Sequence, residues 1–155
     1  MAKQSAGILL YRFADKNLQV FLVHPGGPFF RNKDDGSWSV PKGEFTDDED
    51  PLVAAKREFL EETGQTVEGK FIELEPITQK SGKKVYAWAV EGNIDHETIT
   101  SNLFEIEWPP RSGKKQAFPE IDRAEWFGVE TAGIKINPAQ IGLIEQLKSY
   151  AGPSR

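Results

Sequence analysis

The segment Gly43–Gly64, GEFTDDEDPLVAAKREFLEETG, carries eight carboxylates and only two cationic side chains. Its second half has the signals of a helix. Asp50 is placed to cap the N-terminus, Pro51 suits the first turn, and Gly64 suits the C-terminal cap. The segment therefore predicts one capped helix that carries an unusual density of negative charge.

Three glutamates of this helix, Glu58, Glu61 and Glu62, fall on one arc at the helical period of about 100° per residue. Like charges three and four residues apart repel, and acids near the C-terminal end of a helix also oppose its dipole. We expect the small side chains of Ala54 and Ala55 to share this arc and leave open space above the carboxylates. A bound divalent cation would offset the repulsion, and Mg²⁺ or Mn²⁺ prefers oxygen ligands of this kind. The arc is therefore predicted to be a metal site.

The apolar residues of the same helix predict the face that meets the core. Leu52, Phe59 and Thr63 fall together on the helical wheel, with Val53 and Leu60 beside them. We expect all five to face the interior. A calcium loop of the EF-hand type does not fit the segment, because Leu52 stands where that pattern requires glycine.

The spacing of the segment resembles the Nudix hydrolase signature, G-x5-E-x7-R-E-U-x-E-E-x-G-U, in which U is a bulky apolar residue. Gly43 and Glu49 match its first two fixed positions, and the run from Arg57 to Gly64 matches the rest. The resemblance implies that Gly43, Glu49 and Gly64 have structural roles, with both glycines shaping the loop and the helix end.

Two positions depart from the usual pattern, since Phe59 is aromatic and Gln65 is polar. An aromatic side chain is harmless if it packs in the core, and the polar one removes no metal ligand. The resemblance implies an α/β fold, the Nudix-type α/β/α sandwich with a mixed β-sheet. We expect a single domain over residues 1–155.

The activity that the resemblance implies is hydrolysis of a phosphoanhydride bond in a nucleoside diphosphate linked to another group, with Mg²⁺ or Mn²⁺ as cofactor. It implies that Glu58, Glu61 and Glu62 bind the metal and that one of them serves as the base. The backbone carbonyl of Lys42 matches a position that supplies a further ligand. Arg57 is expected to orient a carboxylate, either Glu49 or Glu61. The expected catalytic residues are Glu58, Glu61 and Arg57.

Four further residues are candidates for substrate or metal contact. Lys42 precedes the signature and is placed to meet a phosphate. Trp108 comes before two prolines and is a candidate for stacking on a base, and Arg111 lies in the second of two lysine-rich loops that could gather a polyphosphate. Glu120 is a candidate extra metal ligand or base. Each has a competing role as an ordinary surface or core residue.

The signature does not specify the identity of the substrate. The Pro-Lys-Gly run before the signature and the stretch SAGILLYR are similar to those of diadenosine tetraphosphate hydrolases, which favours a dinucleoside polyphosphate. The alternatives are a pyrophosphatase for nucleoside triphosphates, capped RNA or nucleotide sugars, and a Nudix-fold protein that binds nucleotide without hydrolysis.

The rest of the chain reads as strands with few helices, which favours a mixed sheet covered by helices. We expect strands at 5–13 and 18–24, a short strand at 38–40, and strands within 70–78, 83–92 and 123–129. Residues 95–108 read as a loop ending in a strand, 109–122 as a long loop, and 137–150 as an amphipathic helix.

Composition limits the partners. The chain has 155 residues, a formal net charge of −5 and no cysteine, so thiol catalysis and cysteine-held zinc are excluded. No run approaches the length of a membrane span, and the start lacks the apolar core of a signal peptide. We expect a cytoplasmic protein whose partner is a small nucleotide. Nucleic acid is not expected, except for a capped RNA end, because the acidic balance opposes general binding.

Overall fold

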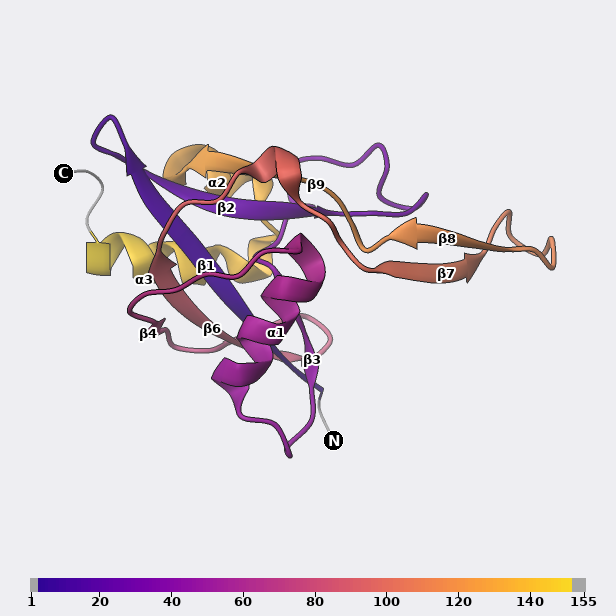
Figure 1. Cartoon of the computed structure of the whole chain (residues 1–155), viewed down its shortest axis with the longest axis horizontal. Coiled ribbons are helices and arrows are strands. Elements are labelled where there is room, and N and C mark those ends of the chain that lie inside the picture. The colour runs from indigo at the N-terminus through magenta and orange to yellow at the C-terminus, as the bar shows by residue number, and fades with distance from the viewer. Residues whose placement is uncertain (1–2, 152–155) are drawn as a thin grey trace.

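The computed structural model describes residues 3–151 and places helices on both faces of a β-sheet (Figure 1). The strands are β1 (Gln4–Ala14), β2 (Asn17–Pro25), β3 (Lys42–Phe45), β4 (Ile72–Glu73), β5 (Ile77–Thr78), β6 (Lys84–Glu91), β7 (Leu103–Glu107), β8 (Lys115–Pro119) and β9 (Ile121–Gly128). The helices are α1 (Pro51–Thr63), α2 (Val129–Lys135) and α3 (Ile141–Ala151), with short 3-10 turns at His96–Thr98 and Pro138–Gln140.

The main sheet is mixed, as expected. Its strand order is β4-β6-β1-β2-β9, with β3 also paired to β1 and β5 to β6. Strand β1 is parallel to β6 and antiparallel to β2 and β3. The β1–β2 connection turns at Asp15 and Lys16, both with positive φ, which is the backbone that a tight hairpin of this twist requires.

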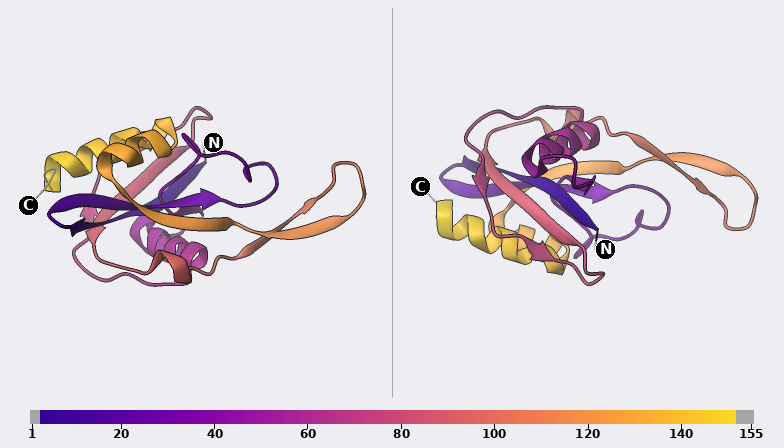
Figure 2. Two further views of the ribbon diagram at one scale, coloured as in Figure 1. Left: turned by 90° about the horizontal axis from the view of Figure 1, so that it is seen from above. Right: turned by 90° about the horizontal axis from the view of Figure 1, so that it is seen from below.

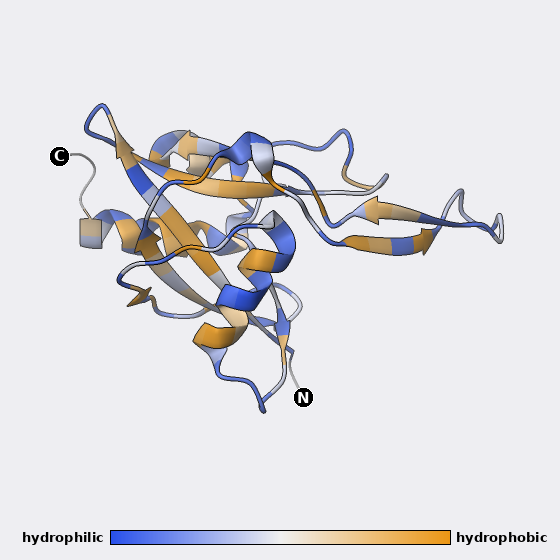
Figure 3. Ribbon diagram, viewed as in Figure 1, coloured by the Kyte–Doolittle hydropathy of each residue, from blue (hydrophilic) through white to orange (hydrophobic). Residues whose placement is uncertain are grey.

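The sheet separates two apolar layers. Alternate residues of β1 point to opposite faces, so Ile8 packs on the α1 side and Leu9 on the α3 side, each with no exposed surface. Figure 2 shows α1 and α3 on opposite sides of the strands. The expected sandwich is therefore present, and Figure 3 shows the apolar colour concentrated along the sheet strands. Within residues 3–151 there is no helix with the length and apolarity that crossing a membrane requires.

The prediction of a continuous loop at 109–122 is wrong. Residues Lys115–Pro119 form β8, which pairs antiparallel with β7 in a separate two-stranded sheet. This β7–β8 hairpin projects beyond the body of the molecule (Figure 1). The prolines before Lys115 mark only the turn, and the strand that follows them lacks an uninterrupted apolar run.

Two other segments differ from expectation. Residues 38–40 make only isolated bridges, from Ser39 to Val23 and from Trp38 to Ile136. Helix α2 at Val129–Lys135 was not expected, because its sequence VETAGIK is too short to show a helical period.

Helix α1 is oriented differently from the predicted wheel. Val53 and Leu60 are 57% and 46% exposed, so the expectation that they face the core is wrong. Ala54 and Ala55 are fully buried together with Phe59, so the alanines leave no open space. The helix packs closely against the sheet, and small side chains on the contact face allow that approach.

Candidate active site

The two ends of α1 are fixed as the sequence predicts. Asp50 caps the N-terminus, accepting a hydrogen bond at Oδ2 from the backbone N–H of Val53 at 3.1 Å. Gly64 ends the helix with φ of 74°, and its N–H donates to the carbonyl of Leu60 at 2.7 Å. A left-handed backbone at this point favours glycine. These caps set where the glutamates of the last turns lie.

Strand β3 lies directly against the glutamates. A Cβ added at Gly43 would come within 2.0 Å of both carboxylate oxygens of Glu58, so only glycine permits this approach. One residue earlier, the backbone N–H of Lys42 donates to Oε1 of Glu62 at 3.2 Å. The signature glycine therefore provides the space that the Glu58 carboxylate occupies.

Arg57 gathers the acids around it. It donates to both oxygens of Glu49 at 2.8 Å each, and its Nη1 donates to Oε1 of Glu61 at 3.2 Å. The same Nη1 lies 3.6 Å from Oε2 of Glu58. The hydrogen bonds to Glu49 are the main reason that the pKa of Arg57 is raised above its ordinary value. The fork geometry of arginine suits this bidentate contact.

Burial and mutual repulsion change the acidity of two glutamates. Burial, followed by the nearby charge of Glu58, raises the pKa of Glu62 to about 8. Burial, followed by the charge of Glu61, raises the pKa of Glu58 to about 7. Oε2 of Glu58 is buried and accepts no hydrogen bond from any residue in the described range. The charge of Arg57, 3.6 Å from this oxygen, opposes the rise in the pKa of Glu58 without cancelling it, so a further positive charge would stabilise the ionised form.

Glu120 reaches the same region from outside the signature. Burial, followed by the charge of Glu61, raises the pKa of Glu120. Its backbone N–H donates to the carbonyl of Asn102 at 2.8 Å, and the N–H of Asn102 donates to the carbonyl of Glu61 at 3.0 Å. The base of the β7–β8 hairpin is thus joined to the last turn of α1.

The side chain of Lys42 is largely shielded from water. Burial lowers the pKa of its ammonium group, and the charge of Lys83 lowers it further, while Glu62, Glu44 and Glu58 oppose the shift. Lys42 therefore lies within the electrostatic reach of the acidic cluster, where an anionic ligand would stabilise its charged form.

The acids do not form a closed ligand cluster as they stand. Across residues 3–151, no group of three histidine or acidic side chains is arranged to hold a metal ion. Arg57 holds Glu49 and Glu61, which accounts for part of the separation. The donor set nevertheless fits a hard divalent cation, because it consists of carboxylates, one of which has a buried oxygen that receives no hydrogen bond.

Trp108 and Arg111 lie apart from the glutamates. Both belong to the turn that joins β7 to β8, where Trp108 precedes a cis peptide bond to Pro109 and Arg111 has φ of 62°. The turn stands at the outer end of the projecting hairpin (Figure 1). The structure therefore brings Glu120 to the acidic cluster and keeps Trp108 and Arg111 at a distance from it.

The sequence did not predict the contact between Phe29 and Trp108. The ring of Phe29 lies against that of Trp108, with centroids 5.4 Å apart and an angle of 81° between the planes. Phe29 is 62% exposed, and its neighbour Phe30 is 39% exposed. Two adjacent aromatic residues inside a glycine- and proline-rich loop were the available signal, because such a loop has no core to bury them.

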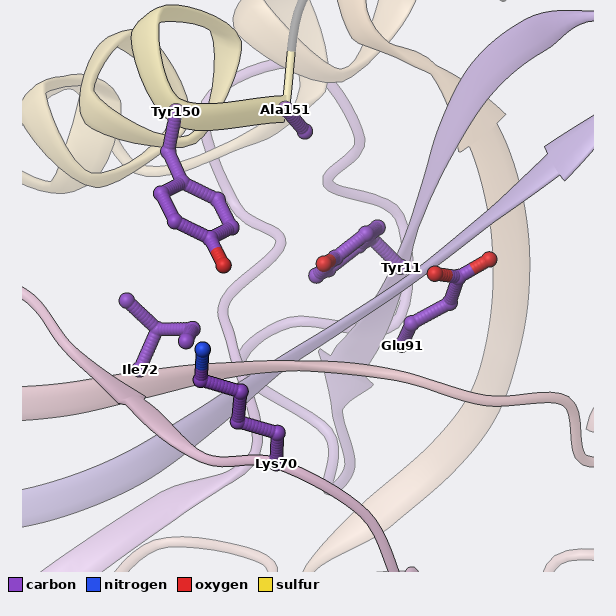
Figure 4. A pocket seen from close by; sticks show the side chains of 6 residues that line it. All are labelled: Tyr11, Lys70, Ile72, Glu91, Tyr150 and Ala151. Atoms are coloured by element: carbon purple, nitrogen blue, oxygen red, sulfur yellow. The ribbon is translucent and has the colours of Figure 1, made fainter.

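A separate hollow of about 540 Å³ opens near the end of α3 (Figure 4). Tyr11, Ile72 and Ala151 line it, together with Lys70, Glu91 and Tyr150. Tyr11, Ile72 and Ala151 belong to the apolar layer on the α3 side of the sheet. The hollow therefore lies across the sheet from α1 and is not lined by the signature glutamates.

Comparison with known proteins agrees with this geometry. The NUDIX domain family model matches residues 1–147. A comparison with curated proteins gives no match. Among solved structures, a C. elegans Ap4A hydrolase binary complex is similar with a TM-score of 0.65 and 22% identity, over 97% of this chain and 98% of that chain.

Two more solved structures share the fold. The NUDIX domain of Shewanella oneidensis NrtR complexed with ADP ribose has a TM-score of 0.67 and 16% identity, over 97% of this chain and 89% of that chain. A MutT structure from a study of Aliivibrio salmonicida and Vibrio cholerae has a TM-score of 0.56 and 15% identity, over 95% of this chain and 96% of that chain. At these identities the similarity concerns the fold.

Proposed function

Because the chain belongs to the NUDIX family of hydrolases, we propose that it cleaves a phosphoanhydride bond in a nucleoside diphosphate derivative with Mg²⁺ or Mn²⁺. The observation that supports this most directly is the buried Oε2 of Glu58, which accepts no hydrogen bond from the described residues and lies among acids of raised pKa. A cation at this position would offset both the burial and the repulsion.

The proposed metal ligands are Glu58, Glu61 and Glu62, with the backbone carbonyl of Lys42 as a further donor and Glu120 as an accessory acid. When bound, the metal supplies positive charge to the phosphate oxygens and acidifies water toward neutral pH. These residues are contributed by α1, β3 and the end of the β7–β8 hairpin, so one site is built from three segments.

The roles of the side chains follow from their surroundings. Without a cation, burial and the charge of Glu61 raise the pKa of Glu58 to about 7. With the cation at Oε2, Oε1 is the oxygen of Glu58 that can accept a proton from the attacking water. Arg57 restrains Glu61 and Glu49, so it is a positioning residue. Lys42 is a candidate for phosphate contact, because an anion beside its ammonium would offset the burial and the nearby charge of Lys83 that lower its pKa.

A dinucleoside polyphosphate is the favoured substrate. The support is the fold similarity to C. elegans Ap4A hydrolase together with the Pro41-Lys42-Gly43 sequence before the signature. The similarity to a NUDIX domain complexed with ADP ribose justifies ADP-ribose as a second test compound. Nucleoside triphosphates and capped RNA remain the other substrates to compare.

The test is product release measured by chromatography with diadenosine tetraphosphate, ADP-ribose and a nucleoside triphosphate. We expect turnover with Mg²⁺ and none with a chelator. Binding of these compounds without any hydrolysis in Mg²⁺ or Mn²⁺ would show a non-catalytic nucleotide-binding protein and overturn the proposal.

A further inference from the structure

The chain contains the sequence SGKK twice, in two turns whose glycines share a left-handed backbone. Residues 80–84 read KSGKK between β5 and β6, and residues 111–115 read RSGKK between β7 and β8. The glycine of each turn has a left-handed backbone, with φ of 88° at Gly82 and 74° at Gly113. The two turns therefore present similar cations in different surroundings.

Two of the three cations of the first turn have a partner among the described residues. Nζ of Lys83 lies 2.9 Å from Oε2 of Glu44, and the Lys84 ammonium lies 5.0 Å from the centre of the Tyr86 ring. These contacts tie the turn to β3 and β6. The first turn therefore has one neutralised cation, Lys83, whereas Lys80 is exposed and forms no ion pair with residues 3–151.

The cations of the second turn have no acidic partner. Arg111, Lys114 and Lys115 form no ion pair with any residue between 3 and 151. The nearest acid in sequence, Glu107, instead uses Oε1 to accept from the N–H of Arg111 and Oε2 to accept from the N–H of Gly113, both at 3.0 Å. Glu107 thus holds the turn in shape, and its carboxylate offsets part of the positive charge from inside the turn while the three cationic side chains form no direct ion pair with a described residue.

An aromatic surface adjoins these cations. The ring of Trp108 contacts Phe29, which is 62% exposed. The backbone N–H of Trp108 donates to the carbonyl of Lys114 at 2.9 Å, so the ring and the cations belong to one hydrogen-bonded turn. The loop that carries Phe29 lies close against the hairpin, since a Cβ at Gly27 would come within 2.8 Å of the Phe104 ring.

The hairpin begins and ends at the acidic cluster. Asn102, just before β7, bonds to the carbonyl of Glu61, and Glu120 directly follows β8. The N–H of Gly26 also donates to the carbonyl of Glu120 at 2.8 Å, which joins the aromatic loop to the same point. Five residues of extended strand reach about 17 Å, so the turn lies at about that distance from the cluster.

We propose that this turn and Phe29 bind the far nucleotide of a dinucleoside polyphosphate whose polyphosphate chain lies at the acidic cluster. One base stacks against Phe29 and Trp108, and the adjoining phosphates pair with Arg111 and Lys114. The proposal rests on the proposed function, since it assigns the second end of the same substrate. Stacking on an aromatic ring and pairing with exposed cations are the contacts that a nucleotide uses.

The charge of the molecule favours a small anion over larger partners at this turn. The chain has a net charge of −5, and general nucleic-acid binding requires many phosphate contacts along a basic face. Three cations on one turn match a short polyphosphate. A single triphosphate held at the acidic cluster does not extend to the turn, so the turn distinguishes two-ended from one-ended substrates.

The test compares the affinities of diadenosine tetraphosphate and ATP by calorimetry in Mg²⁺, in a Glu62→Gln background that limits turnover. We expect Arg111→Ala/Lys114→Ala to weaken tetraphosphate binding roughly fivefold, and Phe29→Ala to weaken it roughly tenfold. ATP affinity should change less than about twofold in each. The matched control is Lys80→Ala/Lys84→Ala, which removes the same charge from the other turn and should leave both affinities unchanged.

Four results would overturn the inference: equal losses for both compounds, no loss for either, an equal loss in the control, or no tetraphosphate binding without the turn substitutions. A concentration-dependent change in sedimentation caused by the turn substitutions would instead assign the surface to a second copy and also overturn it. The proposed function is judged separately by hydrolysis in the unmodified protein. Hydrolysis without preferential binding of the tetraphosphate would support the proposed function and contradict the inference. Preferential binding that depends on the turn, without hydrolysis, would support the inference and contradict the proposed function.

Discussion

The acidic face of α1 and the basic turn of the β7–β8 hairpin are the two concentrations of like charge in the proposed site, and they differ in burial. Glu62 and Glu58 are shielded enough that their pKa values rise to about 8 and 7. Arg111 and Lys114, by contrast, remain exposed. Buried charges of one sign require a counter-ion and become reactive, whereas exposed charges contribute weaker, salt-sensitive contacts at longer reach.

The largest expected effect comes from removing one buried charge. We predict that Glu62→Gln lowers kcat/KM by roughly 10²–10³-fold, because a proposed metal ligand is lost. Steady-state kinetics in Mg²⁺ would measure it. Glu73→Gln is the matched control, since Glu73 is exposed on β4, and it should retain full activity. Full activity in Glu62→Gln would remove Glu62 from the site.

The second prediction concerns the space that Gly43 provides. Gly43→Ala places a methyl group within 2.0 Å of the Glu58 carboxylate and forces one of them to move. We expect about a 100-fold loss of activity, since small displacements of a catalytic group are costly. Gly133→Ala is the control: nothing lies within 4 Å of a Cβ there, and the helix α2 should gain stability. Similar activities in the two variants would show that the close approach is unimportant.

The third prediction separates the positive charge of Arg57 from its paired hydrogen bonds to Glu49. Arg57→Lys keeps a positive charge but loses the paired hydrogen bonds to Glu49. We expect activity to fall roughly tenfold with little change in KM, as for other groups that orient ligands. The measurement is the separate determination of kcat and KM. A change in KM alone would indicate direct contact between Arg57 and the substrate.

The fourth prediction concerns stability without metal. The folded protein holds protons on Glu62 and Glu58 up to pH values of about 8 and 7, whereas these groups have an ordinary pKa of 4.5 when unfolded. Between the unfolded and the folded pKa values, the folded state binds more protons than the unfolded state. The free energy of unfolding therefore falls as pH rises from about 5 to 8. In chelator, Glu62→Gln should recover on the order of 2 kcal/mol, or about 6 °C in Tm, at pH 8. Parallel pH curves for the two proteins would contradict this.

The smallest effect is expected on the outer face of the hairpin. Leu103 is 64% exposed, so Leu103→Thr should change unfolding free energy by less than about 0.5 kcal/mol and leave activity unchanged. Chemical denaturation and sedimentation would check it. A shift in oligomeric state would mean that this face, and not the turn, has a protein partner.

The sequence predicted the helix of the signature well, because caps and charge spacing are local. Asp50 and Gly64 bound α1 as expected. The buried face was predicted incorrectly at Val53 and Leu60, because hydrophobicity favoured them while close packing on the sheet selected Ala54 and Ala55. Helix–sheet distance is a tertiary property that residue type alone does not encode.

The sequence named the signature glutamates and also Lys42 and Glu120 as candidates, but it did not predict the contacts that bring them together. The short distance between Gly43 and Glu58 follows from strand pairing that no local pattern specifies. The position of Glu120 depends on the hairpin that precedes it, and β8 was read as loop because its residues are largely polar or exposed. The contact of Phe29 with Trp108 joins residues 79 positions apart, which spacing could not reveal.

The hairpin leaves the fold after Asn102 and returns at Glu120, and the main sheet and α1 do not depend on its outer residues. Insertions or deletions of residue pairs in the hairpin would change its length while α1 keeps its position. We expect such variants to fold normally and to differ in the length of polyphosphate they prefer. Changes in hairpin length could therefore alter which substrates are preferred while the proposed catalytic residues on α1 stay unchanged.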